Sequence, residues 1–111
     1  MDVDRSGNIY ALGKFNSAVF KFAPDGKFIT RFGSRGDEQG QFRAPQDIAV
    51  DWEGRVFVSD FRGVQVFSGD GRYLALIDVA DPAFGLAFDS SNELIVASRD
   101  RVVKLRLQDE R

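Results

Sequence analysis

Three stretches of this chain resemble one another, and their spacing limits the fold more than any other feature of the sequence. The stretches are VDRSGNIYAL at 3–12, VDWEGRVFVS at 50–59 and FDSSNELIVA at 88–97. Their aspartates, Asp4, Asp51 and Asp89, lie 47 and 38 residues apart. A second repeated pattern follows each stretch and twice contains an Asp-Gly turn pair, at 25–26 and 70–71. A period near 40–47 residues made of short strand-like segments is typical of the blades of a β-propeller.

The segments between the turn signals have the character of strands. They are short, rich in β-branched and aromatic residues, and several, such as 56–58 and 74–77, are apolar on both faces. Such strands belong to a sheet that is covered on both sides. Long stretches of 3.6-residue periodicity, which helical repeats of this length require, do not occur. We therefore predict an all-β fold, a partial β-propeller of four-stranded antiparallel blades with each first strand innermost.

Composition narrows the range of functions. The net charge of -2 provides no general attraction to nucleic acid or to an anionic membrane. The absence of cysteine excludes disulfides, thiolate metal sites and a cysteine nucleophile, and the absence of histidine removes the commonest general base and metal ligand. No apolar stretch approaches the length of a membrane span, and no signal-peptide pattern is present. We expect no enzyme activity, no metal, no cofactor and no membrane partner, and no feature indicates a cellular compartment.

The segment GQFRAPQDIAVDWEGRVFVSD, followed by VQVFSGDG, resembles an NHL repeat, the unit of a six-bladed β-propeller. The resemblance extends over nearly the whole chain. It implies a scaffold that binds protein, with RNA binding also known in the family, and that Phe42 plugs the space between blades. Asp60 matches the family's aspartate after the second strand of a blade. The following Phe61-Arg62-Gly63 is too short to supply the usual Asn and Arg, so the family's polar network there does not carry over.

The repeats divide the chain into three blades. Residues 1–43 form blade one, with its first strand mostly missing, residues 44–82 form a complete blade two, and residues 83–111 form blade three without an outer strand. The chain is thus expected to be either a piece of a larger propeller or a protomer that completes its ring by association. Because the terminal blades would expose apolar flanks, we expect a homodimer or higher oligomer. Those flanks should present Phe20, Phe22, Phe28, Leu105 and Leu107.

One face of a propeller carries the loops between its second and third strands and the connectors between blades, and loops on a rigid scaffold gather binding groups. Its candidate ligand-binding residues are Arg35, Arg43, Gln46, Phe61, Arg62, Arg99 and Arg101. We call this the loop face; Lys14, Asn16 and Asp37 belong to it as well. The opposite face should be acidic, with Asp4, Asp25, Asp51, Glu53, Asp70 and Asp89. The alternative is that all of these are solvated loop tips.

Three motifs have a structural interpretation beside a functional one. Arg35-Gly36-Asp37 matches an integrin-recognition tripeptide, but a three-residue match is weak, and we interpret it as part of a connector. Asp2, Asp4, Ser6 and Gly7 imitate the start of a calcium loop, yet the closing carboxylate is absent because its position holds Gly13, so we interpret the motif as a strand turn. Asp47 and Asp60 resemble paired catalytic carboxylates, for which we also favour a structural role.

Three classes of function follow. The first is a non-catalytic scaffold that binds protein partners through the loop face and associates with itself through blade edges. The second is binding of RNA or another polyanion on the arginine-rich face, which stacking aromatics beside the arginines would favour; the sequence offers only Phe61 for this. The third is a fragment of a propeller enzyme of the lactonase or lyase type, whose catalytic residues lie in blades not present.

Overall fold

The computed structural model describes residues 1–79 and 81–106, and these contain strands but no helix. The first sheet has the order β1-β2-β3-β4 and is built from β1 (Asp2–Val3), β2 (Ile9–Gly13), β3 (Ala18–Phe22) and β4 (Phe28–Phe32). Each strand pairs with the next in antiparallel fashion. The Asp25-Gly26 pair forms the turn between the last two, where Gly26 has a φ of 90°. No helix that could cross a membrane is found in the described part of the chain.

Two further sheets repeat this arrangement. The second contains β7 (Asp47–Val50), β8 (Val56–Asp60), β9 (Gly63–Phe67) and β10 (Tyr73–Ile77), again antiparallel and in chain order. The third contains β11 (Gly85–Phe88), β12 (Leu94–Ala97) and β13 (Val102–Leu105). The connector from the first to the second sheet holds a small parallel pair, β5 (Ser34–Arg35) with β6 (Gln41–Phe42). The predicted all-β fold of four-stranded antiparallel sheets is confirmed.

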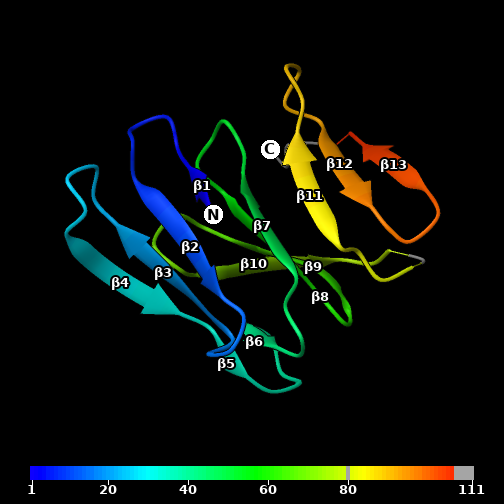
Figure 1. Ribbon diagram of the computed structural model, residues 1–111, viewed down its shortest axis with the longest axis horizontal. Helices are drawn as coiled ribbons and strands as arrows, with labels where there is room; N and C mark the ends of the chain where they lie inside the picture. Colours follow the sequence, from blue (N-terminus) through cyan, green and yellow to red (C-terminus); the bar gives the residue numbers. More distant parts are fainter. Residues whose placement is uncertain (80, 107–111) are drawn as a thin grey trace.

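The first strand of each sheet lies innermost, and β1, β7 and β11 run side by side through the middle of the molecule (Figure 1). An aspartate joins each pair of neighbours. The Asp2 carboxylate accepts a hydrogen bond of 2.8 Å from the Val50 amide, and the Asp47 carboxylate accepts one of 2.8 Å from the Leu86 amide. These bonds link inner strands that belong to different sheets and do not pair with one another through the backbone.

Two apolar cores fill the spaces between the sheets. The core between the first and second sheets includes Tyr10, Val19, Phe42, Val58 and Phe67, all of them buried. Phe42 comes from the connector, is fully buried and meets the Phe67 ring edge-on at 5.7 Å between centroids. It occupies the plug position that the family resemblance implies. The core between the second and third sheets is formed by Ala49, Phe57, Val64, Val66, Ala83, Leu86, Leu94 and Val96.

The flank residues expected from the sequence divide into two groups. The strand register places Phe20 and Phe22 on the side of the first sheet opposite to Tyr10 and Val19, so they face away from the second sheet. Phe28 packs edge-on against Phe22 and is 58% exposed. Leu105 was wrongly expected on an exposed flank, because it packs against the core between the second and third sheets. Leu107 lies outside the described residues.

We expect Phe42→Ala to destabilise the protein by about 3–5 kcal/mol, because the truncation removes a fully buried ring and leaves a cavity between two sheets. Denaturant unfolding followed by tryptophan fluorescence measures this change. Phe15→Ala is the matched control: Phe15 is 90% exposed, so its truncation should alter the free energy of unfolding by less than about 0.5 kcal/mol. Equal effects of the two substitutions would contradict the plug assignment.

Candidate functional site

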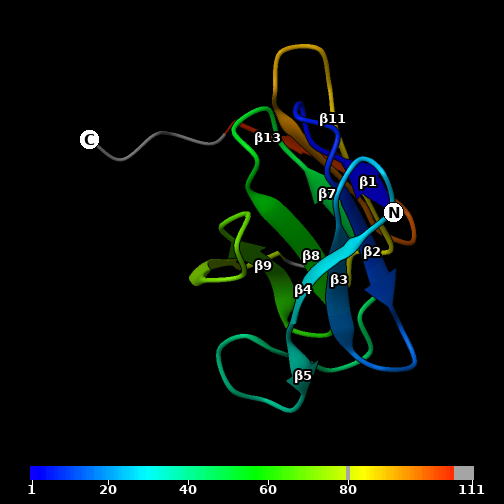
Figure 2. The same ribbon diagram turned by 90° about the vertical axis from the view of Figure 1, so that its left-hand side faces the viewer.

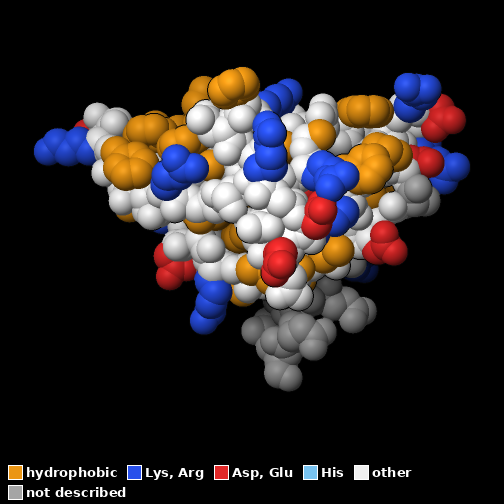
Figure 3. Space-filling view, turned by 90° about the horizontal axis from the view of Figure 1, so that it is seen from below, with side chains coloured by type: hydrophobic (Ala, Val, Ile, Leu, Met, Phe, Trp, Pro, Cys, Tyr) orange, Lys and Arg blue, Asp and Glu red, His pale blue; other side chains and the backbone are white. Residues whose placement is uncertain are grey.

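The loop face lies at the lower side of the molecule in Figure 1, where the β2–β3 and β8–β9 turns and the connector with β5 and β6 end. The same connector projects below the sheets in the side view (Figure 2). By topology the β12–β13 turn and the connector between β10 and β11 belong to the same face. Figure 3 looks directly at it and shows Lys and Arg side chains interspersed with hydrophobic ones.

Three phenylalanines are exposed on this face, each from a different segment. Phe15 in the β2–β3 turn is 90% exposed, Phe61 in the β8–β9 turn 66%, and Phe84 immediately before β11 51%. Sequence reasoning identified only Phe61. Phe15 could have been found because it stands in a turn between two strands, where a large aromatic has no core to enter. The loop face therefore carries more exposed aromatic surface than expected.

Two of the predicted arginines are held in exposed ion pairs. Arg43 approaches Asp37 at 2.7 Å, with both side chains more than half exposed, and Arg101 approaches Asp81 at 3.5 Å. Such pairs are individually weak, but each places a carboxylate beside the guanidinium and so reduces its attraction for a phosphate. Asp37 also closes the Arg35-Gly36-Asp37 tripeptide, so the aspartate of that motif contributes to the internal structure of the connector.

Arg62 has a structural role. Its guanidinium donates hydrogen bonds to the backbone carbonyls of Asp37, Glu38 and Gln41, all in the connector, and its side chain is 27% exposed. One of its nitrogens lies 3.7 Å from the Asp60 carboxylate. Arg62 thus fastens the connector to the second sheet. Its guanidinium faces the chain instead of a ligand.

Two buried polar side chains complete this attachment. The Asp60 carboxylate accepts hydrogen bonds from the backbone amides of Arg43 and Arg62 and from the side-chain Nε2 of Gln65. Gln65 in turn donates to the Gln41 carbonyl at 2.7 Å and accepts from the Gly40 amide at 3.1 Å. Both residues are 1% exposed. Asp60, Arg62 and Gln65 therefore form a polar network between the second sheet and the connector.

The remaining predicted residues are dispersed over the same face. Arg35 lies exposed in β5. Gln46 is partly buried and donates from its side chain to the Ala44 carbonyl at 3.1 Å, so it turns towards its own connector. Arg99 is exposed and lines a shallow hollow together with Phe84, Asp81 and Asp100. Arg35 and Arg99 are consequently the predicted arginines that are exposed and that have no ion pair among the described residues.

The opposite face is less acidic than its residue types suggest. Asp51 is buried and pairs with Arg55 at 2.7 Å, and Asp89 pairs with Lys104 at 2.9 Å. The backbone hydrogen bond from Glu93 and the Lys104 ammonium hold the pKa of Asp89 at about 2. The expected polarisation between a basic and an acidic face is thus reduced by ion pairs on both sides.

The calcium-like motif is a repeated turn. Asp4 accepts hydrogen bonds from the amides of Ser6 and Asn8, each at 2.9 Å. Asp51 and Asp89 accept the same pair of bonds, from the residues two and four positions further on. One oxygen of each carboxylate is therefore used to shape the turn between the first two strands of a sheet. In the described residues no group of three or more acidic side chains is arranged to hold a metal ion.

The carboxylates of Asp47 and Asp60 both have hydrogen-bond partners within the fold. Asp47 accepts hydrogen bonds from the amides of Ile48 and Leu86, and Asp60 is enclosed in the network with Gln65. Their arrangement supports the structural interpretation.

Comparison with solved structures shows the fold. A protein of unknown function from Bacteroides caccae superposes with a TM-score of 0.65 at 22% identity, over 94% of this chain and 39% of that one. Streptogramin B lyase superposes with a TM-score of 0.68 at 16% identity, over 95% of this chain and 39% of the lyase. The fold is of the propeller type. This chain spans about two fifths of the length of either neighbour, and no family model matches it.

We expect Arg62→Met to release the connector while leaving the sheets folded, because the substitution removes the hydrogen bonds to its three carbonyls but keeps the aliphatic stem. Hydrogen exchange of the amides at 36–42 should accelerate by about tenfold or more, in line with the loss of charge-assisted bonds worth about 1.5–3 kcal/mol. Arg99→Met is the matched control and should leave these rates unchanged. Unaltered exchange in Arg62→Met would contradict the fastening role.

Proposed function

We propose that this chain is a non-catalytic propeller scaffold that binds a protein partner through the loop face. The observation that carries this proposal is the exposure of Phe15, Phe61 and Phe84 on one face, interspersed with arginines. Aromatic residues and arginine are the types enriched at protein–protein interfaces. The connector that presents part of the face is held by buried hydrogen bonds, so little ordering is required when a partner binds.

Protein is favoured over RNA by the state of the arginines. Arg43 and Arg101 are paired with carboxylates, and Arg62 is bonded to backbone carbonyls. Binding of a polyanion depends on cations that can neutralise phosphates, and the net charge of -2 adds no long-range attraction. The three phenylalanines would suit base stacking, so RNA is the competing outcome in the experiment below.

The absence of catalysis is part of the same proposal. The sequence has no histidine and no cysteine, and both inward carboxylates considered for acid–base chemistry are bonded to backbone amides. The likeness to streptogramin B lyase is at 16% identity and supports the fold alone. Membership of the NHL-repeat family is also a proposal. It is supported by Gly40-Gln41-Phe42, whose phenylalanine fills the space between two sheets.

Selection from a random peptide library displayed on phage tests the binding face. We expect peptides selected on the wild-type chain to lose at least about tenfold in affinity for a Phe15→Ser, Phe61→Ser, Phe84→Ser triple variant, because each phenylalanine presents apolar surface to the partner. Trp52→Ser is the matched control, since Trp52 is 51% exposed but stands in a turn of the opposite face. Fluorescence polarisation with labelled peptides measures the change.

Two results would contradict the proposal. Peptides that bind the triple variant as tightly as the wild type would show that the partner docks elsewhere. Retention of single-stranded RNA, with an affinity that falls steeply with salt and is lost in an Arg35→Glu, Arg99→Glu variant, would move the function to polyanion binding.

We also propose self-association through the outer flank of the first sheet, which presents Phe20, Phe22 and a Phe28 that is 58% exposed. Apolar surface of this kind is unusual on a stable monomer. Sedimentation velocity should show a concentration-dependent dimer or larger species that Phe28→Asp weakens by at least about tenfold. Leu76→Asp, on the outer strand of the second sheet, is the matched control and should leave association unchanged. A monomer at high concentration would disprove this idea.

A further inference from the structure

The two spaces between neighbouring sheets are filled differently. The connector from the first to the second sheet covers residues 33–46, whereas the one from the second to the third covers 78–84 and is half as long. The longer connector inserts Phe42, which packs against Phe67 and closely approaches Gly33. The approach at Gly33 is so close that an added Cβ would lie 2.5 Å from the Phe42 ring. In the shorter connector, residues 78–83 include no aromatic residue, and Phe84 is its last residue.

Strand registers show which residues surround the corresponding place in the second space. In the second sheet Val58 pairs with Gln65 and Val56 with Phe67, while in the third sheet Val96 pairs with Val103 and Leu94 with Leu105. Val103 and Leu105 therefore occupy the positions of Gln65 and Phe67. In the first space these two positions contact the longer connector and its plug. In the second space they should border a vacancy.

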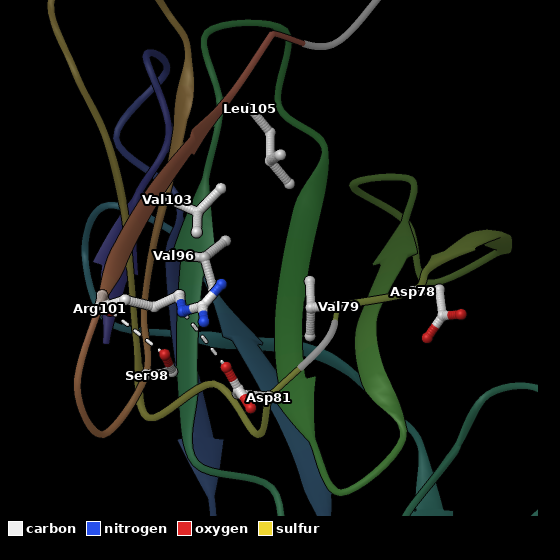
Figure 4. Close-up of a pocket in the computed structure, with 8 residues that line it drawn as sticks. All are labelled: Asp78, Val79, Asp81, Val96, Ser98, Arg101, Val103 and Leu105. Carbon is white, nitrogen blue, oxygen red and sulfur yellow. Dashed lines mark hydrogen bonds and ion pairs between the residues drawn. The ribbon is translucent and has the colours of Figure 1, made fainter.

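A cavity of about 280 Å³ is present at this place. Val79, Val96, Val103 and Leu105 form its apolar walls, and Figure 4 shows Leu105, Val103 and Val96 above Arg101, Ser98 and Asp81, with Val79 on the other side beside Asp78. Ser98 and Arg101, from the β12–β13 turn, lie with Asp81 at its lower end, on the side of the loop face. The volume is at the lower limit of small-ligand pockets and suits a single aromatic ring. The cavity thus opens at the edge of the loop face.

Charge at the mouth restricts the ligand further. Asp78 and Asp81 both line the cavity, against the single guanidinium of Arg101, which is 3.5 Å from Asp81. Asp81 stands four residues before β11, as Arg43 stands four residues before β7. The residue that follows the plug in the first space is thus basic, whereas the equivalent residue in the second space is acidic. The mouth carries a net negative charge and complements a cation.

We propose that this cavity receives an aromatic side chain of a protein partner, with a basic residue next to it in the partner's sequence. The partner would insert the ring where Phe42 is supplied internally in the first space, and its cation would meet Asp81. This inference rests on the proposed function, since it names the partner chemistry recognised at one edge of the loop face. It specifies an aromatic–basic segment in extended conformation.

The chain itself supplies the probe. A capped synthetic peptide with the sequence of residues 40–45, Gly-Gln-Phe-Arg-Ala-Pro, carries the ring and the adjacent cation. Titrated into the ¹⁵N-labelled protein, it should shift the amide signals of Val96, Ser98, Arg101 and Val103 saturably. The same peptide with its phenylalanine replaced by alanine should bind at least about tenfold more weakly, because the ring provides the apolar surface that is buried.

Two variants of the protein sharpen the test. Val103→Phe should fill the cavity and abolish the saturable shifts. Asp81→Lys should weaken binding of the peptide at least about threefold without altering the apolar walls, and it keeps the test decisive if Val103→Phe does not fold. Trp52→Ser, in the exposed turn between β7 and β8 on the opposite face, is the matched control and should bind like the wild type.

The possible failures are separable. Equal affinity of the phenylalanine and alanine peptides, or no saturable shift with either, would overturn the cavity inference and leave the loop face to be judged by the library selection. Shifts confined to the amide signals of Phe15 and Phe61 would also overturn the cavity inference, while supporting binding at the loop face. If the peptide binds at the cavity and library-selected peptides bind the triple phenylalanine variant as tightly as the wild type, the cavity inference stands and the wider loop face is contradicted.

Discussion

Strands β8 and β9 are buried along their whole length on both faces, and this double burial dictates the rest of the structure. A sheet whose two faces are both apolar requires a neighbour on each side. Val56 and Val58 pack towards the first sheet, whereas Phe57 and Val66 pack towards the third. The neighbouring sheets are less evenly buried, so the second sheet is the central element around which the other two assemble.

The connectors follow from that arrangement. Sheets that stack face to face leave a space wherever their outer strands diverge, and a connector has to cross this space to reach the next inner strand. In the first case the connector fills the space with Phe42 and is fastened by Arg62, Asp60 and Gln65. The same segment presents Arg35 and Asp37 to solvent. Structural attachment and a candidate binding surface are therefore properties of one connector.

The sequence was most informative where a residue's role is local. The repeated aspartates at positions 4, 51 and 89 indicated turns. Each carboxylate accepts hydrogen bonds from backbone amides two and four residues further along the chain, and such contacts depend only on the local sequence. Short runs of β-branched and aromatic residues between turn signals indicated the strands for the same reason. The buried plug Phe42 was expected from the family resemblance. The propeller-type fold could thus be predicted before any coordinates were known.

The side-chain directions at the site could not be predicted in the same way. Arg62 stands in a turn and was expected to face a ligand, but the adjacent connector offers three carbonyls that accept hydrogen bonds from its guanidinium. Gln65 interrupts an apolar strand, and a polar residue at such a position indicates that its side chain is buried with a hydrogen-bond partner. This role of Gln65 was not expected from the sequence. Leu105 was misplaced because its face depends on the register with Leu94.

Unequal connectors explain how a repeat can lose its internal symmetry without losing its fold. The hydrogen bonds that hold the inner strands together, from Asp2 to Val50 and from Asp47 to Leu86, do not involve the plug position. The same strand arrangement is therefore compatible with the shorter connector between the second and third sheets. The apolar walls that remain, among them Val96 and Leu105, still favour an apolar filling. The space that the longer connector fills with Phe42 therefore corresponds to a cavity between the second and third sheets.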